Sequence, residues 1–247
     1  MFGNNRGGEY VDDTLSPLWG NENELGAAVN ACLSRVFLRM FIALVVTSVT
    51  AFAVSTSEAI LSFILSEIWV FYVIIIAQLA FVFVLSFAIN KMSIAVANVL
   101  FFTYALLMGL TLSLIFLVYE IGLIYQAFGI SALMFSVMAL FGVLTRRDLS
   151  SLGSFCFMGL IGVIIASLVN FFLQSEMLDY IISYIAIFVF LGLTAYDTFR
   201  IKKMLRSANE AGQTQAIARI SVIGALWLYL DFINLFLRVL RIMGRRR

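Results

Sequence analysis

Seven long, nearly uncharged apolar runs occupy most of this chain and constrain its fold more than any other feature. They cover residues 36–57, 68–90, 94–118, 121–144, 152–173, 180–199 and 217–242. A helix needs about 20 mostly apolar residues to cross roughly 30 Å of hydrocarbon, and only a helix or a closed barrel satisfies its backbone hydrogen bonds there. The runs reach that length and lack the alternation of barrel strands. The sequence therefore predicts an all-α membrane protein, a bundle of seven transmembrane helices.

The composition excludes a soluble globular domain and several kinds of active site. Only 12% of the residues are charged, whereas soluble domains carry about a quarter. The chain has no histidine, which removes Ser-His and Cys-His catalytic pairs, His-ligated zinc and imidazole pH sensing. Cys32 and Cys156 are interpreted as small hydrophobic side chains. We expect no enzymatic activity, no resident cofactor and no nucleic-acid partner.

Residues 1–34 are polar, rich in Gly, Asn and acidic residues, and lack the pattern of a cleaved signal peptide. We interpret them as a mostly disordered cytoplasmic leader, with a short helix from about Glu24 leading into the first run. Residues 35–247 are predicted to form the transmembrane domain.

Charges outside the runs predict the orientation in the membrane. Basic residues precede the first run and occupy the second, fourth and sixth connections, whereas the other three connections contain acidic residues and no Lys or Arg. By the positive-inside rule, the N-terminus is cytoplasmic, here in a bacterial inner membrane. Arginines near the C-terminus conflict with seven crossings, so a re-entrant last run stays open as an alternative; they are Arg238, Arg241 and residues 245–247.

Two aspartates, Asp197 and Asp231, lie inside apolar runs, whereas the other 12 of the 14 acidic residues lie in the leader or the connections. An ionised carboxylate at membrane depth costs at least about 2.5 kcal/mol, so such residues usually face the bundle interior and find a partner. These two residues are therefore the candidate functional site.

A polar stripe surrounds Asp231 on the last run, because five residues fall within about 80° of one another at 100° per residue. They are Trp227, Asp231, Asn234, Arg238 and Arg241. The stripe is either a packing seam, in which Asn, Tyr or Arg neighbours satisfy Asp231, or the lining of a pathway or a proton-sensitive gate.

The two aspartates can meet if the last two helices are antiparallel and their depths match. Asp197 lies about 4.5 Å along the helix from Arg200, whereas Asp231 lies about 18 Å from Arg219. For the two aspartates to lie at the same depth, the sixth helix must continue beyond Arg200, or the first turns of the seventh helix must lie in the cytoplasm. Carboxylates about 4 Å apart repel by roughly 4 kcal/mol at an effective dielectric of 20. A close pair would share a proton, move apart on losing it, and hold a divalent cation such as Ca²⁺ transiently.

Four segments resemble the Bax inhibitor-1 family, also called the transmembrane Bax inhibitor motif family. They are GLTLSLIFLVY at 109–119, TRRDLSSLGSF at 145–155, LTAYDTFRIK at 193–202 and GALWLYLDFINLFLRVLR at 224–241. The resemblance implies seven helices around a central last helix, and a pH-sensitive calcium leak gated by the residues that match Asp197 and Asp231. It also implies a basic residue at the cytoplasmic end of the second helix, where this chain has Lys91 in place of the common Arg. Some bacterial members instead bind and restrain a membrane-anchored ATP-dependent protease.

Two functional hypotheses therefore stand. One is a cation leak channel in which Asp197 and Asp231 are the gating pair and a transient calcium site. The other is a modulator of a membrane protease or quality-control machine, contacted through the leader. An intramembrane aspartyl protease is disfavoured, because Leu228–Leu230 replaces the Gly-x-Gly expected before the second aspartate. Side chains expected to support the pair are Lys91, Tyr196, Asn234 and Arg238.

Overall fold

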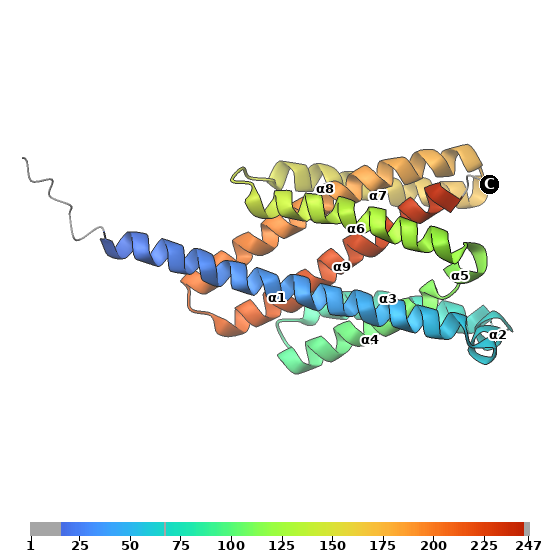
Figure 1. The fold of residues 1–247 in the computed structure, drawn as a ribbon, viewed down its shortest axis with the longest axis horizontal. Coiled ribbons are helices and arrows are strands. Elements are labelled where there is room, and N and C mark those ends of the chain that lie inside the picture. Colours follow the sequence, from blue (N-terminus) through green and yellow to red (C-terminus); the bar gives the residue numbers. More distant parts are fainter. Residues whose placement is uncertain (1–15, 67, 245–247) are drawn as a thin grey trace, which may run out of the picture.

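A computed structural model describes residues 16–66 and 68–244 (Figure 1). Its helices are α1 (Ser16–Ser55), α2 (Glu58–Ser66), α3 (Ile68–Ala88), α4 (Ile94–Leu112), α5 (Ile115–Val118), α6 (Ile121–Leu144), α7 (Ser150–Leu173), α8 (Glu176–Glu210) and α9 (Thr214–Gly244). The described part of the chain contains no strand, which confirms the all-α class. Within residues 16–66 and 68–244, six segments are long and apolar enough to cross a membrane: α1 from Glu24 onwards, α4 with α5, α6, α7, α8 and α9. Within α3 a shorter apolar stretch was found, so the count of seven stays a prediction.

Helix α1 begins inside the segment that was expected to be a disordered leader. The helix expected from about Glu24 is present and begins earlier, at Ser16, so the expectation of disorder is wrong for residues 16–23. Residues 1–15 lie outside the described residues. Val29 and Leu33 are buried, and with Val36 and Met40 they form one apolar stripe at helical spacing. This stripe packs against the bundle, so residue 34 marks no structural boundary.

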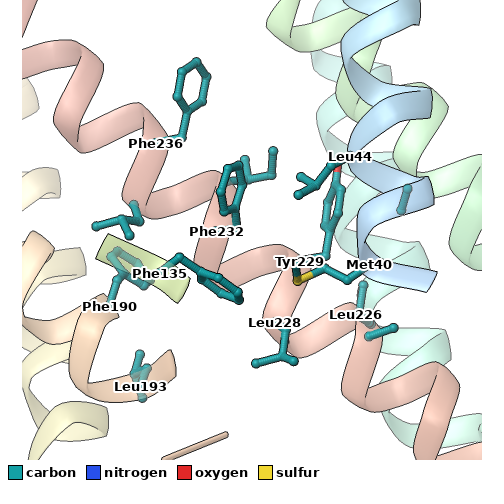
Figure 2. Close-up of a cluster of buried hydrophobic side chains, with 14 of the residues drawn as sticks. Met40, Leu44, Phe135, Phe190, Leu193, Leu226, Leu228, Tyr229, Phe232 and Phe236 are labelled. Atoms are coloured by element: carbon teal, nitrogen blue, oxygen red, sulfur yellow. The ribbon is translucent and has the colours of Figure 1, made fainter. Parts of the chain in front are cut away.

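Helix α9 lies in the middle of the bundle, between α1 and α4 on one side and α6 and α8 on the other (Figure 1). Of its most apolar 18-residue window, 78% is buried, against 11% for α7. Figure 2 shows Phe232 and Tyr229 of α9 among buried side chains from neighbouring helices. The Phe232 ring meets the Phe135 ring of α6 edge-on, with centroids 5.6 Å apart. The buried polar residues of α9, Ser221 and Asp231, therefore lie among protein side chains.

Close contacts between these helices depend on small residues and hydrogen bonds. Lipid is as apolar as the helix faces, so the hydrophobic effect contributes little to helix association. At Gly142 of α6, an added Cβ would overlap the Ala195 carbonyl oxygen of α8. The Thr47 hydroxyl of α1 donates to the Ala105 carbonyl of α4 at 2.9 Å and is hydrogen-bonded to the Tyr229 hydroxyl at 2.7 Å. These contacts join α6 to α8, and α1 and α4 to α9.

Helices α8 and α9 form an antiparallel pair that sets the depth of both aspartates. α8 continues without a break to Glu210, about three turns beyond Arg200, and α9 starts at Thr214. One of the two conditions for matched depths, a sixth helix that extends beyond Arg200, is therefore met. The ends of the pair confirm the alignment, because Arg241 Nε lies 3.2 Å from Asp179 Oδ2.

Helix α9 runs from one end of the bundle to the other, which disfavours the re-entrant alternative. In Figure 1 the C-terminal end of α9 lies opposite the α8–α9 turn and the start of α1. Arg241 is thus at the end that carries the acidic connections, where Asp179 offsets its charge. Residues 245–247 lie outside the described residues.

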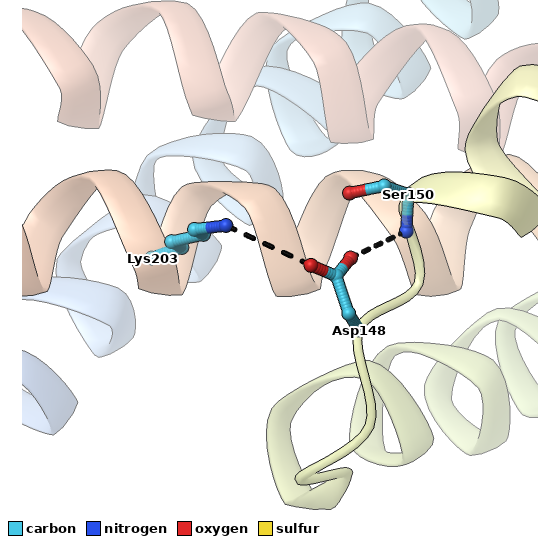
Figure 3. A network of polar contacts seen from close by, with 3 residues as sticks. All are labelled: Asp148, Ser150 and Lys203. Atoms are coloured by element: carbon cyan, nitrogen blue, oxygen red, sulfur yellow. Dashed lines mark hydrogen bonds and ion pairs between the residues drawn. The ribbon is translucent and has the colours of Figure 1, made fainter.

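The α6–α7 connection is held against α8 by an exposed polar cluster (Figure 3). Asp148 Oδ1 accepts a hydrogen bond from the Ser150 backbone N–H at 2.8 Å, and Asp148 Oδ2 lies 3.8 Å from Lys203 Nζ. Hydrogen bonds from Ser150, supported by the Lys203 charge, hold the pKa of Asp148 below its ordinary value. This aspartate lies outside the membrane-spanning helices.

We predict that Gly142→Ala lowers the free energy of unfolding by about 1 to 3 kcal/mol, because the new Cβ must displace the backbone of α8. Thermal unfolding of the purified protein in detergent measures this. The matched control is Gly129→Ala on the same helix, where a Cβ meets nothing within 4 Å. That change should be neutral or mildly stabilising, since alanine favours helix over glycine by up to about 1 kcal/mol. Equal unfolding temperatures for the two variants would contradict the packing described here.

Candidate intramembrane aspartate site

Both aspartates line one cavity of about 700 Å³ between α7, α8 and α9. Its lining is Gly153, Ser154, Phe157, Leu160, Val163, Ile164 and Ser167 of α7; Phe190, Leu193, Tyr196, Asp197 and Arg200 of α8; and Trp227, Leu230, Asp231, Asn234 and Arg238 of α9. The α7 wall is mostly apolar, whereas α8 and α9 supply all the charges. The cavity thus combines an apolar wall with a charged one.

Asp231 is the more deeply buried of the two carboxylates. Its residue is 5% exposed, and its Oδ2 has no hydrogen-bond partner among the described residues. Asp197 is partly buried and lies close enough for its charge to act on Asp231. A buried carboxylate oxygen without a donor is costly when ionised, so this oxygen is available to a proton or a cation. The structure therefore brings the two predicted residues together in one site.

A basic side chain stands at each end of the cavity. Arg200 stacks on Trp227, with its guanidinium carbon 4.5 Å from the ring centroid, a geometry that attracts a cation to the ring face. Arg200 also attracts Asp197, one turn away on the same helix. At the opposite end, half-buried Arg238 feels the charges of both Asp179 and Arg241. The two aspartates are therefore flanked by positive charges along the cavity.

The supporting residues predicted from the sequence divide into two groups. Tyr196, Asn234 and Arg238 line the cavity with the aspartates. Lys91 does not, because it lies exposed in the α3–α4 connection. The Asn234 amide donates to the Leu230 carbonyl at 2.8 Å, within its own helix. One of its two amide N–H groups is therefore used within α9 rather than on Asp231.

The α7 wall was missed in the sequence analysis. Its Ser167 has a buried hydroxyl with no hydrogen-bond partner in the described part of the chain. A signal was present, because Ser154, Phe157, Leu160, Ile164 and Ser167 recur at helical spacing on one face, with a hydroxyl at each end. The apolar character of this run concealed the face.

Several apolar helices and a cavity lined by charged side chains between three of them define a multi-pass helical membrane protein with an intramembrane site. The family model described as Inhibitor of apoptosis-promoting Bax1 matches residues 29–247. The chain therefore belongs to the Bax inhibitor-1 family, as the resemblance of its motifs predicted.

Similar proteins occur in distant bacteria. The inner membrane protein YbhL of Escherichia coli (strain K12) is 44% identical over 221 residues, which cover 90% of this chain and 94% of YbhL. An uncharacterized protein of Borreliella burgdorferi is 43% identical over 218 residues, covering 88% of this chain and 93% of that protein. An uncharacterized membrane protein of Streptococcus pyogenes serotype M3 is 42% identical, covering 76% and 80% respectively.

We predict that Asp231→Asn raises the free energy of unfolding at pH 8 by about 1 to 3 kcal/mol, because it removes a buried charge and an oxygen that lacks a donor. Residues shaped for function commonly cost stability. Thermal unfolding in detergent measures the change. Asp148→Asn, which alters an exposed aspartate in the same way, should not raise it. A less stable Asp231→Asn protein would mean that Asp231 is a structural residue.

Proposed function

We propose that this protein is a pH-sensitive leak channel for calcium or related cations, gated by Asp197 and Asp231. The observation that carries the proposal is that both carboxylates line one cavity inside the bundle, one of them with an oxygen lacking a hydrogen-bond partner. Oxygen ligands suit Ca²⁺, and conduction requires that binding be weak enough for release. Among the described residues no three Asp, Glu, His or Cys side chains gather to hold a metal ion. The permeant ion would meet two carboxylates only.

Proton loss would open the gate through repulsion between the two carboxylates. A shared proton lets them coexist, whereas two full charges about 4 Å apart repel by roughly 4 kcal/mol at an effective dielectric of 20. A term of this size can shift an equilibrium between helix arrangements that differ by a few kcal/mol. In the closed arrangement Arg200, rather than Lys91, would offset the charge of Asp197.

We further propose that the N-terminus faces the cytoplasm of a bacterial cell and that α3 completes seven crossings. Lys91 lies in the α3–α4 connection, Arg146 and Arg147 lie in the α6–α7 connection, and Lys202, Lys203 and Arg206 lie in the last turns of α8. Glu58, Glu120 and Glu176 lie at or beside the connections of the opposite end. The positive-inside rule places the basic end in the cytoplasm. Arg200 would then stand at the cytoplasmic side of the cavity and Arg238 at the other side.

Calcium flux into proteoliposomes that contain an indicator dye tests the gate. Flux should rise between pH 6 and 8, by at most about tenfold per pH unit for one titrating proton. Asp231→Asn should flatten this dependence to less than about twofold, since an amide cannot ionise in this range. Asp148→Asn should keep the wild-type pH profile. An unchanged profile in Asp231→Asn would refute the gate.

A second candidate, binding of a membrane-anchored protease, is favoured by one observation. The N-terminal part of α1 extends beyond the rest of the bundle in Figure 1, where a partner could contact it. Because Val29 and Leu33 are buried, a deletion that tests this idea should end at residue 23. On this hypothesis the deletion abolishes co-purification with the protease and leaves flux unchanged. Retained binding would exclude the helix extension as the contact.

A further inference from the structure

The cavity that contains the aspartates opens sideways, towards the space that lipid occupies. Helix α7 packs chiefly on α8 and makes no comparable contact with α9, so a groove remains between α7 and α9 with α8 as its floor. Two of its α7 side chains are largely exposed, Phe157 at 59% and Ile164 at 58%. A molecule dissolved in the bilayer could therefore reach this groove without passing through either end of the bundle.

The polar atoms that lack partners in the groove are acceptors for a cationic donor. Asp231 Oδ2 and Ser167 Oγ are both buried, and neither has a hydrogen-bond partner among the described residues. Of the two basic groups, Arg200 stacks on Trp227, and half-buried Arg238 lies near Arg241, which pairs with Asp179. An anionic headgroup would have to compete with these contacts and would approach two carboxylates. The acceptor atoms without hydrogen-bond partners thus favour a positively charged ligand.

We propose that the groove between α7 and α9 binds a primary amine with a long alkyl chain, taken up from the bilayer. A primary ammonium has three N–H donors, and the carboxylates of Asp231 and Asp197 are acceptors for them in the groove. The alkyl chain lies along Phe157 and Ile164, where burial stabilises it. A cavity of about 700 Å³ accommodates a ligand of this size. The proposal does not depend on calcium conduction.

Fluorescence of Trp227 reports occupancy, because Trp227 lines the groove. The chain has three tryptophans, so Trp19→Phe and Trp69→Phe leave Trp227 as the sole reporter. The full chain in lipid nanodiscs is titrated with dodecylamine at pH 7.5. We expect a saturable change in emission. Asp231→Asn should weaken binding at least about tenfold, as expected for a lost charge-assisted hydrogen bond.

Controls separate this site from general partitioning into the bilayer. Dodecyltrimethylammonium has the same charge and chain without N–H donors, and it should bind at least about threefold more weakly than dodecylamine. Ser167→Ala keeps both carboxylates and alters a hydroxyl several helical turns along α7 from their level. It should leave the affinity for dodecylamine unchanged, as should Asp148→Asn. Thermal unfolding confirms that each variant is folded.

Three results would overturn the proposal. They are a change in emission that never saturates, equal affinity for the two amphiphiles, and wild-type affinity in Asp231→Asn. Any of these can occur while Asp231 still controls calcium flux, so failure of the amine site is distinguishable from failure of the leak channel.

Discussion

The antiparallel pairing of α8 and α9 is the constraint on which the rest of the structure depends. A connection of only three residues joins the two helices. It therefore makes them neighbours and also restricts how far one can slide along the other. Two contacts hold that alignment, one between Arg200 and Trp227 and one between Arg241 and Asp179. Asp197 and Asp231 lie between these contacts and are placed at comparable depth. A shift of one helix along the other would separate the two carboxylates, and they would no longer form one site.

Burial of α9 explains how a helical bundle embedded in a membrane can contain an aspartate. Surrounding helices enclose α9, and close approach at Gly142 and the hydrogen bonds of Thr47 stabilise that enclosure. In lipid these interactions matter more than apolar area, because the helix exteriors are equally apolar. Helix α7 is the exception. It packs mainly on α8 and leaves one side of α9 facing a groove.

Parts of the site followed from sequence patterns, and others did not. Aspartates in apolar runs identified Asp197 and Asp231, and helical spacing placed Asn234 and Arg238 on the same face as Asp231. Lys91 was expected to support the aspartates because it follows the second run. Position in the chain, however, does not determine which helix faces the cavity. Ser167 was overlooked, because one hydroxyl barely alters the hydropathy of α7 and its significance depends on the wall opposite.

The sequence by itself determined the helical class, most of the spans and the two intramembrane acids, because water and hydrocarbon sort residues by local composition over about 20 positions. It did not determine that α1 begins before Glu24, because the polar, Gly- and Asn-rich composition there predicts disorder. Only the tertiary structure decided that α8 extends beyond Arg200, that both carboxylates line one cavity and that α7 leaves it open at the side. These features arise from packing between helices distant in the chain, whose preferred neighbours no local pattern specifies.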